Sequence, residues 1–323
     1  KMGPHDVGGE FDNKIDTHDH GMTYWEKFSN GLVLCVPETG LIKLDELRKT
    51  AESFGDDYFK MDYFKRVGLS LVELCIQRKL FTRKELVNEK KIAKKNFEVP
   101  ILDLPDPKLI THLHDGIEHN HKQSDFQEDE HGEGPPEYYL DMLATAQILH
   151  SKNIISIEDI QKKIENFERT YPARGISVVI KAWTDSAFRA ALINDAKSAI
   201  YDMGIHLESF ADIICFAHDS RTHHVVVCTL CSCYPRTLLG MPPSWYKSRS
   251  YRSRVVHEPR RVLEEFGTII PENKEVKVHD SNADMRYLVL PERPSGTENW
   301  DEKELSTLIS RDHLVGIRVP TIK

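Results

Sequence analysis

The chain has 323 residues, of which 40% are hydrophobic and 29% charged, and its formal net charge is −8. This length is sufficient for two domains, and the composition is typical of a soluble protein. The negative charge argues against nucleic acid as a partner, and no apolar run reaches the length of a membrane span. Cys35, Cys75 and Cys215 have no framework spacing, so we interpret them as reduced core residues of an intracellular protein, cytoplasmic or mitochondrial. The chain begins Lys-Met-Gly, which leaves a removed leader open.

Residues 1–30 are polar and rich in Gly, Asp and His. A segment of this kind, with the glycine pair at Gly8 and Gly9, favours an extended arm that lies on a partner. A metal site formed by His5, His18 and His20 is a weaker alternative, because no regular element is expected to group them.

Residues 1–99 predict an all-helical domain that includes this N-terminal arm. Apolar residues recur at helical spacing in residues 41–54 and again in residues 56–79. Thr82 and Glu85 then have the spacing of a capping box, which predicts a third, short helix.

Residues 100–136 predict a linker. Pro100, Pro105 and Pro107 stop helices, and low hydrophobicity with high charge is typical of a disordered tether. Neutral imidazole is a good ligand for cobalt, nickel and zinc, so weak metal binding is a second interpretation of this segment. The histidines concerned are His112, His114, His119, His121 and His131.

Residues 137–323 predict an α+β domain. Helical spacing is found first, then short alternating or apolar runs that are typical of strands. Helices followed by a small sheet indicate the α+β class. The expected helices are residues 139–152, 156–170, 176–183, 186–203 and 251–266, and the expected strands are residues 210–216, 225–227, 276–279 and 286–289.

Three of the six cysteines, Cys228, Cys231 and Cys233, lie within six residues, directly after an apolar run. Thiolates gathered in this way bind soft or borderline metals. Cys231 and Cys233 flank one serine, so their thiolates and the backbone nitrogens of Ser232 and Cys233 can share one ion. Such a donor set suits Co(III) or Fe(III) better than zinc, and Cys228 can cap its plane. On spacing alone, a structural zinc site with His223 or His224, or an iron–sulfur cluster with Cys215, stays open.

The segment Cys228-Thr229-Leu230-Cys231-Ser232-Cys233-Tyr234-Pro235 resembles the metal-binding claw of nitrile hydratase alpha subunits and of the thiocyanate hydrolase gamma subunit. The resemblance covers the final third of the chain. It continues through Leu239-Gly240, Pro242-Pro243, Trp245 to Ser248, Tyr251 to Arg254, Glu265 to Gly267, Asp280-Ser281, Arg286-Tyr287, Leu290 to Pro294 and Arg311-Asp312.

The N-terminal part resembles the beta subunit of the same family, most closely that of thiocyanate hydrolase. The matching segments are Pro4 to Glu10, Asp45 to Arg48, Tyr58 and Met61 to Phe64. The chain therefore looks like a fusion of a beta-like helical domain with an alpha-like domain that has a helical arm and a layered α/β core. The barrel that forms the second half of family beta subunits has no counterpart between residue 90 and the alpha-like part.

The resemblance implies a metal ion held by Cys228, Cys231, Ser232 and Cys233. It implies that Cys231 and Cys233 are oxidised to sulfinic and sulfenic acids, and Thr229 is the residue of cobalt-type members. Cobalt as Co(III) is thus expected, with Fe(III) as the alternative and zinc as a minor one. In the family the C≡N carbon is attacked by metal-activated water or by the oxygen on the sulfur of Cys233.

The resemblance also assigns two residues of the helical domain to the site. Arg48 is expected to hydrogen-bond the oxidised cysteines, and Tyr63 to line the substrate pocket. Without the resemblance, Arg48 is a solvated helix charge and Tyr63 a core residue. Arg236 follows the claw where nitrile hydratases usually have tryptophan and thiocyanate hydrolase has arginine.

Three functions are therefore expected in order: hydration of a nitrile to an amide, hydrolysis of thiocyanate, and a non-catalytic subunit that keeps the fold. The absent barrel predicts that a second copy of the chain or a separate subunit covers the metal.

Overall fold

The computed structural model describes residue 7 and residues 11–97, 113–114, 117–118, 136–170, 173–207 and 211–322. The chain divides into two compact units. The N-terminal unit comprises residues 21–165, and the C-terminal unit comprises residues 166–323 together with the arm that ends at His20.

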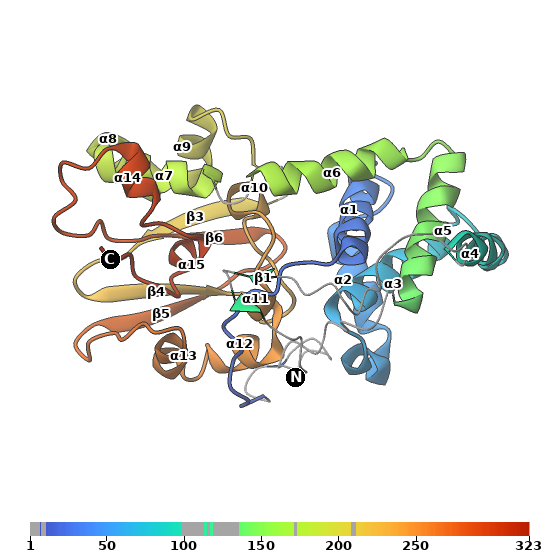
Figure 1. Cartoon of the computed structure of the whole chain (residues 1–323), viewed down its shortest axis with the longest axis horizontal. Helices are drawn as coiled ribbons and strands as arrows, with labels where there is room; N and C mark the ends of the chain where they lie inside the picture. The colour runs from blue at the N-terminus through green and yellow to red at the C-terminus, as the bar shows by residue number, and fades with distance from the viewer. Residues whose placement is uncertain are drawn as a thin grey trace. The chain divides into compact units, whose positions relative to one another are not determined.

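The N-terminal unit is helical (Figure 1). Its helices are α1 (Tyr24–Glu38), α2 (Leu44–Glu52), the 3-10 helix η1 (Gly55–Lys60), α3 (Tyr63–Gln77), α4 (Arg83–Phe97), α5 (Glu137–Ser151) and most of α6 (Ile157–Thr170). Two strands of two residues each, β1 (Leu113–His114) and β2 (Ile117–Glu118), pair antiparallel within the predicted linker. The other linker residues up to 135, His112, His119, His121 and His131 among them, lie outside the described residues.

The predicted arm ends earlier than expected, because α1 begins at Tyr24. Phe28, Leu32 and Val36 recur at helical spacing and are buried, and Glu26 closes a capping box with Thr23. The prediction of an extended segment up to residue 30 was wrong for these residues. The polar residues Ser29 and Asn30, which are buried in α1, interrupt the apolar pattern in the sequence.

The Thr82–Glu85 capping box is confirmed: the Thr82 amide donates to the Glu85 carboxylate at 2.7 Å, and the Glu85 amide to the Thr82 hydroxyl at 3.2 Å. The helix that it opens, α4, has 15 residues and is not short. The helix expected over residues 56–79 is instead η1 followed by α3, because Asp62 leaves helical geometry and its carboxylate accepts the Lys65 amide at 2.7 Å.

The core of the N-terminal unit lies between α3 and α5. Leu71 and Cys75 of α3 and Met142 and Leu149 of α5 are fully buried. Gly68 allows the two helices to approach closely, because a Cβ at this position would lie 2.8 Å from the Met142 sulfur.

The C-terminal unit has helices on both sides of its strands (Figure 1). Strand β3 pairs in parallel with β6, and β4 pairs in parallel with β5. The strands are β3 (Asp212–Ala217), β4 (Thr222–Val227), β5 (Glu275–Asp280) and β6 (Met285–Leu290). The helices are α7 (Ala173–Thr184), α8 (Ser186–Asn194), α9 (Ala196–Asp202), α10 (Arg236–Leu239), α11 (Ser244–Lys247), α12 (Arg249–Arg254), α13 (Pro259–Glu265), α14 (Glu302–Ser306) and α15 (Arg311–Leu314). The expected α+β fold is therefore observed.

Two of the expected helices are broken. Residues 186–203 form α8 and α9, because Asp195, at φ −146° and ψ 87°, leaves the helix and caps the next one through the Ser198 amide. Residues 251–266 form α12 and α13, since α13 begins at Pro259, which cannot donate the hydrogen bond that a continuous helix needs.

The N-terminal arm lies on the C-terminal unit of its own chain. The Ile15 amide donates to the Glu265 carboxylate at 2.9 Å, and the Ser244 amide donates to the Asp19 carboxylate at 3.0 Å. Arg311 forms an ion pair with Asp19 as well. The arm was expected to lie on a partner, whereas these contacts are to the C-terminal unit of the same chain.

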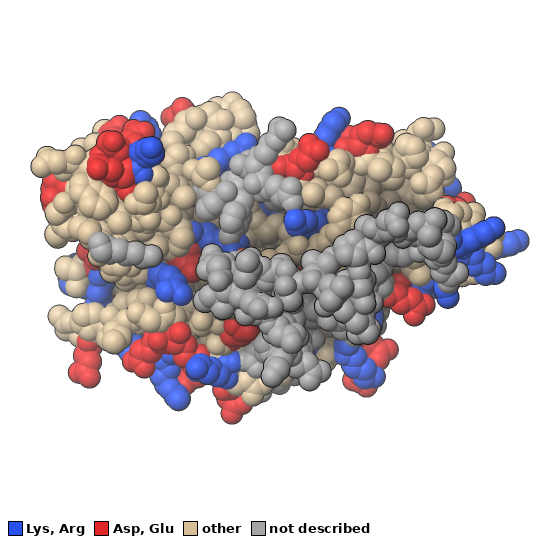
Figure 2. Space-filling model, viewed as in Figure 1, with Lys and Arg blue, Asp and Glu red and all other residues tan. Residues whose placement is uncertain are grey.

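The molecular surface mixes charges of both signs. On the face shown in Figure 2, acidic and basic side chains are interspersed among the other described residues. No helix in the described ranges is both long and apolar enough to cross a membrane.

Candidate metal centre

Strand β4 delivers the claw loop. Val225, Val226 and Val227 are fully buried, and the strand ends at Val227. The loop of residues 228–235 then turns without regular structure until α10 begins at Arg236. This abrupt change from a buried strand to a tight loop is what the apolar run followed by Pro235 predicts.

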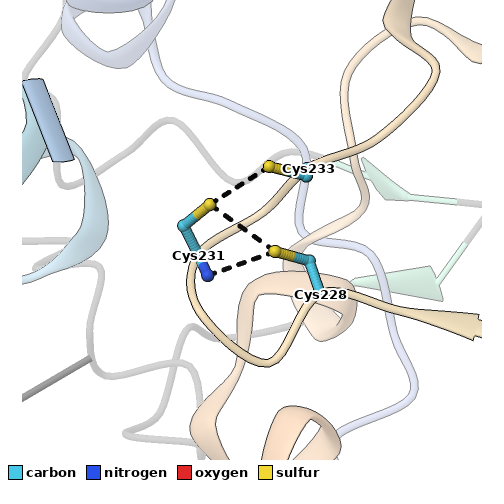
Figure 3. A group of neighbouring side chains, drawn as sticks. All are labelled: Cys228, Cys231 and Cys233. Atoms are coloured by element: carbon cyan, nitrogen blue, oxygen red, sulfur yellow. Dashed lines mark hydrogen bonds between the residues drawn. The ribbon is translucent and has the colours of Figure 1, made fainter. Parts of the chain in front are cut away.

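The three claw sulfurs converge (Figure 3). The Sγ atoms of Cys228 and Cys231 are 3.5 Å apart, and those of Cys231 and Cys233 are 3.4 Å apart. All three lie within 4.8 Å of one another. The Cys231 amide also donates to the Cys228 sulfur at 3.2 Å. Ser232, between Cys231 and Cys233, is buried.

The surroundings disfavour negative charge on these sulfurs when no cation is present. Burial raises the pKa of the Cys228 thiol to about 12. Hydrogen bonding with Cys228 and Cys231, together with burial, raises the pKa of Cys233 well above its ordinary value. Three crowded thiols fit a cation, because a bound cation compensates the charge that burial otherwise penalises.

Residues far from the claw in sequence hold its backbone. The Tyr246 hydroxyl donates to the Cys233 carbonyl at 2.9 Å, and the Tyr251 hydroxyl donates to the Val226 carbonyl at 2.6 Å. Both tyrosines are fully buried. Sequence reasoning gave these tyrosines no function, although both lie in segments that carry the family resemblance.

Thr229 is held on both sides. Its amide and its hydroxyl donate to the two carboxylate oxygens of Asp280, at 2.9 and 2.5 Å. Its carbonyl accepts a hydrogen bond from the Arg252 guanidinium at 2.7 Å. Sequence reasoning missed these two partners as well, because they are 51 and 23 residues away along the chain.

The residues considered as a fourth ligand lie elsewhere. His223 is hydrogen-bonded through Nε2 to the Gly316 carbonyl at 2.7 Å, and Nδ1 of His224 lies 2.8 Å from Nε2 of His279. Cys215 is buried in β3. Within the described part of the chain, the metal-capable group consists of the three claw cysteines. The histidine-completed zinc site and the cluster with Cys215 therefore gain no support.

The other predicted site residues are placed as follows. Arg236 is half-buried at the start of α10, directly after the claw loop. Arg48 lies on α2 with Asp45 at 3.6 Å, and its side chain is 22% exposed. Tyr63 opens α3 and is buried, with its ring 5.0 Å from that of Phe64. Arg48 and Tyr63 belong to the N-terminal unit and the claw to the C-terminal unit, so their approach to the metal stays a prediction.

The arm histidines are also placed. His20 pairs with Asp16 at 2.9 Å, and the His18 ring contacts that of His20 edge to face, with centroids 4.9 Å apart. His5 lies outside the described residues. His18 and His20 are not part of the metal-capable group.

Two family models match the chain. Residues 137–318 match nitrile hydratase, alpha chain, and residues 2–123 match the N-terminal part of the nitrile hydratase beta subunit. The matches follow one another along the chain in the order beta, then alpha, which is the fusion that the sequence predicts.

Individual relatives match through the alpha-like part. The high-molecular weight cobalt-containing nitrile hydratase subunit alpha of Rhodococcus rhodochrous is 44% identical over 190 residues, which is 58% of this chain and 94% of that protein. The thiocyanate hydrolase subunit gamma of Thiobacillus thioparus is 36% identical over 189 residues, 55% of this chain and 78% of that protein. A double-mutant structure of the Fe-type nitrile hydratase from Comamonas testosteroni Ni1 aligns with a TM-score of 0.53 and 35% identity, over 55% of this chain and 87% of that one.

Proposed function

Because the chain belongs to the nitrile hydratase family, as a fusion of beta-like and alpha-like parts, we propose that it hydrates a C≡N group and converts a nitrile to an amide. The observation that carries this proposal is the convergence of Cys228, Cys231 and Cys233 within 4.8 Å at the end of β4. A thiol cluster of this density is suited to a metal.

We propose that the ion is held by the three claw sulfurs and the backbone nitrogens of Ser232 and Cys233. Thr229 and the cobalt-containing relative support Co(III), while the structural likeness to an Fe-type enzyme keeps Fe(III) as the alternative. When bound, such an ion supplies Lewis acidity toward the nitrile or toward water. Zinc stays a minor alternative.

We propose that Cys231 and Cys233 carry the sulfinic and sulfenic oxygens expected from the resemblance. Oxygens of this kind need hydrogen-bond donors, because a buried charge without a partner is costly. Arg48 is the proposed donor, and Tyr63 is the proposed wall of the substrate pocket. Both would approach the claw from the N-terminal unit, within one chain or from a second copy.

Thiocyanate hydrolysis is the second candidate, and Arg236 is the observation that favours it. A half-buried guanidinium directly after the claw attracts a small anion, whereas a neutral nitrile gains little from it. One relative of the chain is named thiocyanate hydrolase subunit gamma, which supports this second candidate. The larger number of nitrile hydratase relatives keeps nitrile hydration first.

We further propose that residues 100–136 link a beta-like domain of residues 1–99 to an alpha-like domain of residues 137–323. A second copy of this chain or a separate subunit is proposed to cover the claw, in the place of the beta-subunit barrel. Native mass measurement of the active protein tests this proposal, and a fully active monomer contradicts it.

The test of function is a paired assay on protein whose cobalt, iron and zinc contents are measured. Amide formation from a small nitrile and consumption of thiocyanate are followed with the same sample, and the claw peptide is examined for added oxygen. Nitrile turnover supports the first proposal. Stoichiometric zinc without added oxygen contradicts the proposed centre, and a correctly loaded protein inactive on both substrates identifies a non-catalytic subunit.

Two variants assign the residues. Arg236→Trp is expected to reduce thiocyanate turnover more than nitrile turnover, and equal turnover before and after the change would show that Arg236 has no part in anion binding. Arg48→Ala is expected to reduce both activity and retention of cysteine oxygen. Arg78→Ala is the matched control, since Arg78 pairs with Glu46 at the surface of the same unit.

A further inference from the structure

Residues of β5 and α12, together with Ser281 directly after β5, hold three backbone positions around Cys228, namely Val226, Val227 and Thr229. The Tyr251 hydroxyl donates to the Val226 carbonyl, and the Ser281 amide donates to the Val227 carbonyl at 2.7 Å. Cys228 follows, and Thr229 is then held by Asp280 and Arg252. The backbone on both sides of Cys228 is thus fixed by residues that are not metal ligands.

Two charged side chains, those of Asp280 and Arg252, contact opposite ends of Thr229. The carboxylate of Asp280 receives the amide and the hydroxyl, while the guanidinium of Arg252 donates to the carbonyl. Arg252 is 1% exposed, so its position is set by packing. An anion at an N–H and a cation at a C=O both match the peptide dipole, and hydrogen bonds to charged groups are stronger than neutral ones.

The orientation of Thr229 decides where the sulfur ligands lie. The peptide groups on either side of Thr229 connect Cys228 to the turn that returns Cys231, whose amide donates to the Cys228 sulfur at 3.2 Å. A rotation of Thr229 would move the backbone that joins Cys228 to Cys231, whose sulfurs are 3.5 Å apart.

We propose that Asp280 is a positioning residue that, through Thr229, holds the claw in its metal-receiving conformation before the ion arrives. Arg252 holds the other side of the same residue. This inference rests on the proposed metal centre, and it adds a condition: metal uptake depends on a carboxylate that does not bind the metal. Preorganisation of this kind lowers the cost of ordering the ligands at binding.

The test uses the full chain without metal, prepared with reductant and chelator. Asp280→Asn removes the acceptor of the Thr229 hydroxyl while keeping the side-chain shape, and Thr229→Val removes the hydroxyl. Asp284→Asn is the matched control, because Asp284 is an exposed carboxylate on the β5–β6 connection with no contact to the claw among the described residues. Circular dichroism and thermal unfolding check that each variant folds.

Two readouts that do not depend on activity are measured. Binding of Co(II) is measured by thiolate-to-cobalt absorption. The affinity for Co(II) is expected to fall about fivefold in each single variant, because one net hydrogen bond contributes about 1 kcal/mol. Reaction of the claw thiols with a thiol reagent is expected to accelerate by a similar factor in the absence of metal. The control is expected to match the unmodified chain in both.

The double variant with both substitutions decides the mechanism. Because each substitution removes the same hydrogen bond, the double variant is expected to lose less than the product of the two single losses. The proposal would be overturned if the loss of cobalt affinity in the double variant equalled the product of the two single losses. It would also be overturned if the single variants had unchanged cobalt uptake and thiol reactivity. If the unmodified chain binds no cobalt or iron, the proposed function fails, and thiol reactivity still tests whether Asp280 positions the claw.

Discussion

Nδ1 of His224 lies 2.8 Å from Nε2 of His279, across the pair of β4 and β5. The two rings belong to a stack that includes Phe216, whose ring centroid is 3.8 Å from that of His279. His218 and His223 stack at 4.0 Å beside them and are buried. This histidine cluster (His218, His223, His224 and His279) lies on β4 and β5 and directly after β3, so its ionisation affects the strands of the C-terminal unit.

The cluster predicts that the protein loses stability in acid. Burial lowers the pKa of His223 and of His279 to about 4 and that of His218 to about 2. An unfolded histidine has a pKa near 6.5, so below that pH the unfolded state binds more protons and the free energy of unfolding falls. The loss is expected to start below about pH 6.5 and to continue toward pH 4, at up to about 1.4 kcal/mol per pH unit for each fully buried histidine.

Denaturant unfolding between pH 7 and pH 4.5 measures this dependence. His279→Phe keeps a ring against Phe216 and removes one titrating group, so it is expected to flatten the pH dependence. His257→Gln changes an exposed histidine and is expected to leave the slope as it is. A slope that His279→Phe does not alter would remove His279 from the cause.

Gly316→Ala is expected to unfold or severely destabilise the C-terminal unit. Gly316 has a φ of +78°, and a Cβ at this position would lie 1.8 Å from the His224 carbonyl oxygen, a backbone atom of β4. The expected cost is about 4 kcal/mol or more, because β4 must move. Gly204→Ala is the matched control: its φ is +77° with nothing within 4 Å, so only backbone strain of about 1–2 kcal/mol is expected. Similar unfolding midpoints for the two variants would contradict the close approach.

Arg254→Met is expected to release the N-terminal arm. The Arg254 guanidinium, whose side chain is 6% exposed, pairs with Glu265 at 2.7 Å and donates to the Asn13 carbonyl at 2.9 Å. Its loss leaves a half-buried carboxylate without its cation, at an expected cost of about 3 kcal/mol. Trypsin cleavage after the exposed Lys14, followed by mass spectrometry, is expected to accelerate. Arg261→Met, which removes a 74% exposed arginine paired with Glu258, should change neither quantity.

Tyr246→Phe is expected to destabilise the chain by about 1 kcal/mol, because the buried Cys233 carbonyl loses its hydrogen bond from the hydroxyl. The claw thiols should also react faster with a thiol reagent. Tyr287→Phe, a half-buried tyrosine of β6 that contacts His279 by its ring, is the control and is expected to stay within about 0.5 kcal/mol. Equal stability and thiol reactivity in both variants would show that the hydroxyl does not hold the claw.

Features that depend on neighbouring residues could be predicted from the order of the amino acids. A sulfur cluster is predicted from the spacing of Cys228, Cys231 and Cys233 and from the apolar strand before them. Residues so near one another in the chain stay close together in space when they share a short loop. The capping box of Thr82 and Glu85 predicts a helix start for the same reason, and it is present. Broken helices at Asp195 and Pro259 were missed, since apolar periodicity runs on across a single capping residue.

The tertiary structure decided which distant residues serve the claw and the arm. Asp280 and Arg252 meet at Thr229, and Glu265 meets Ile15, 250 residues away. Apolar periodicity shows which face of an element is buried but carries no information about which other element covers it. Partners of this kind exist only once β5 lies beside β4 and α12 lies over the loop, because the packing of the whole unit, and no local pattern, sets those neighbours.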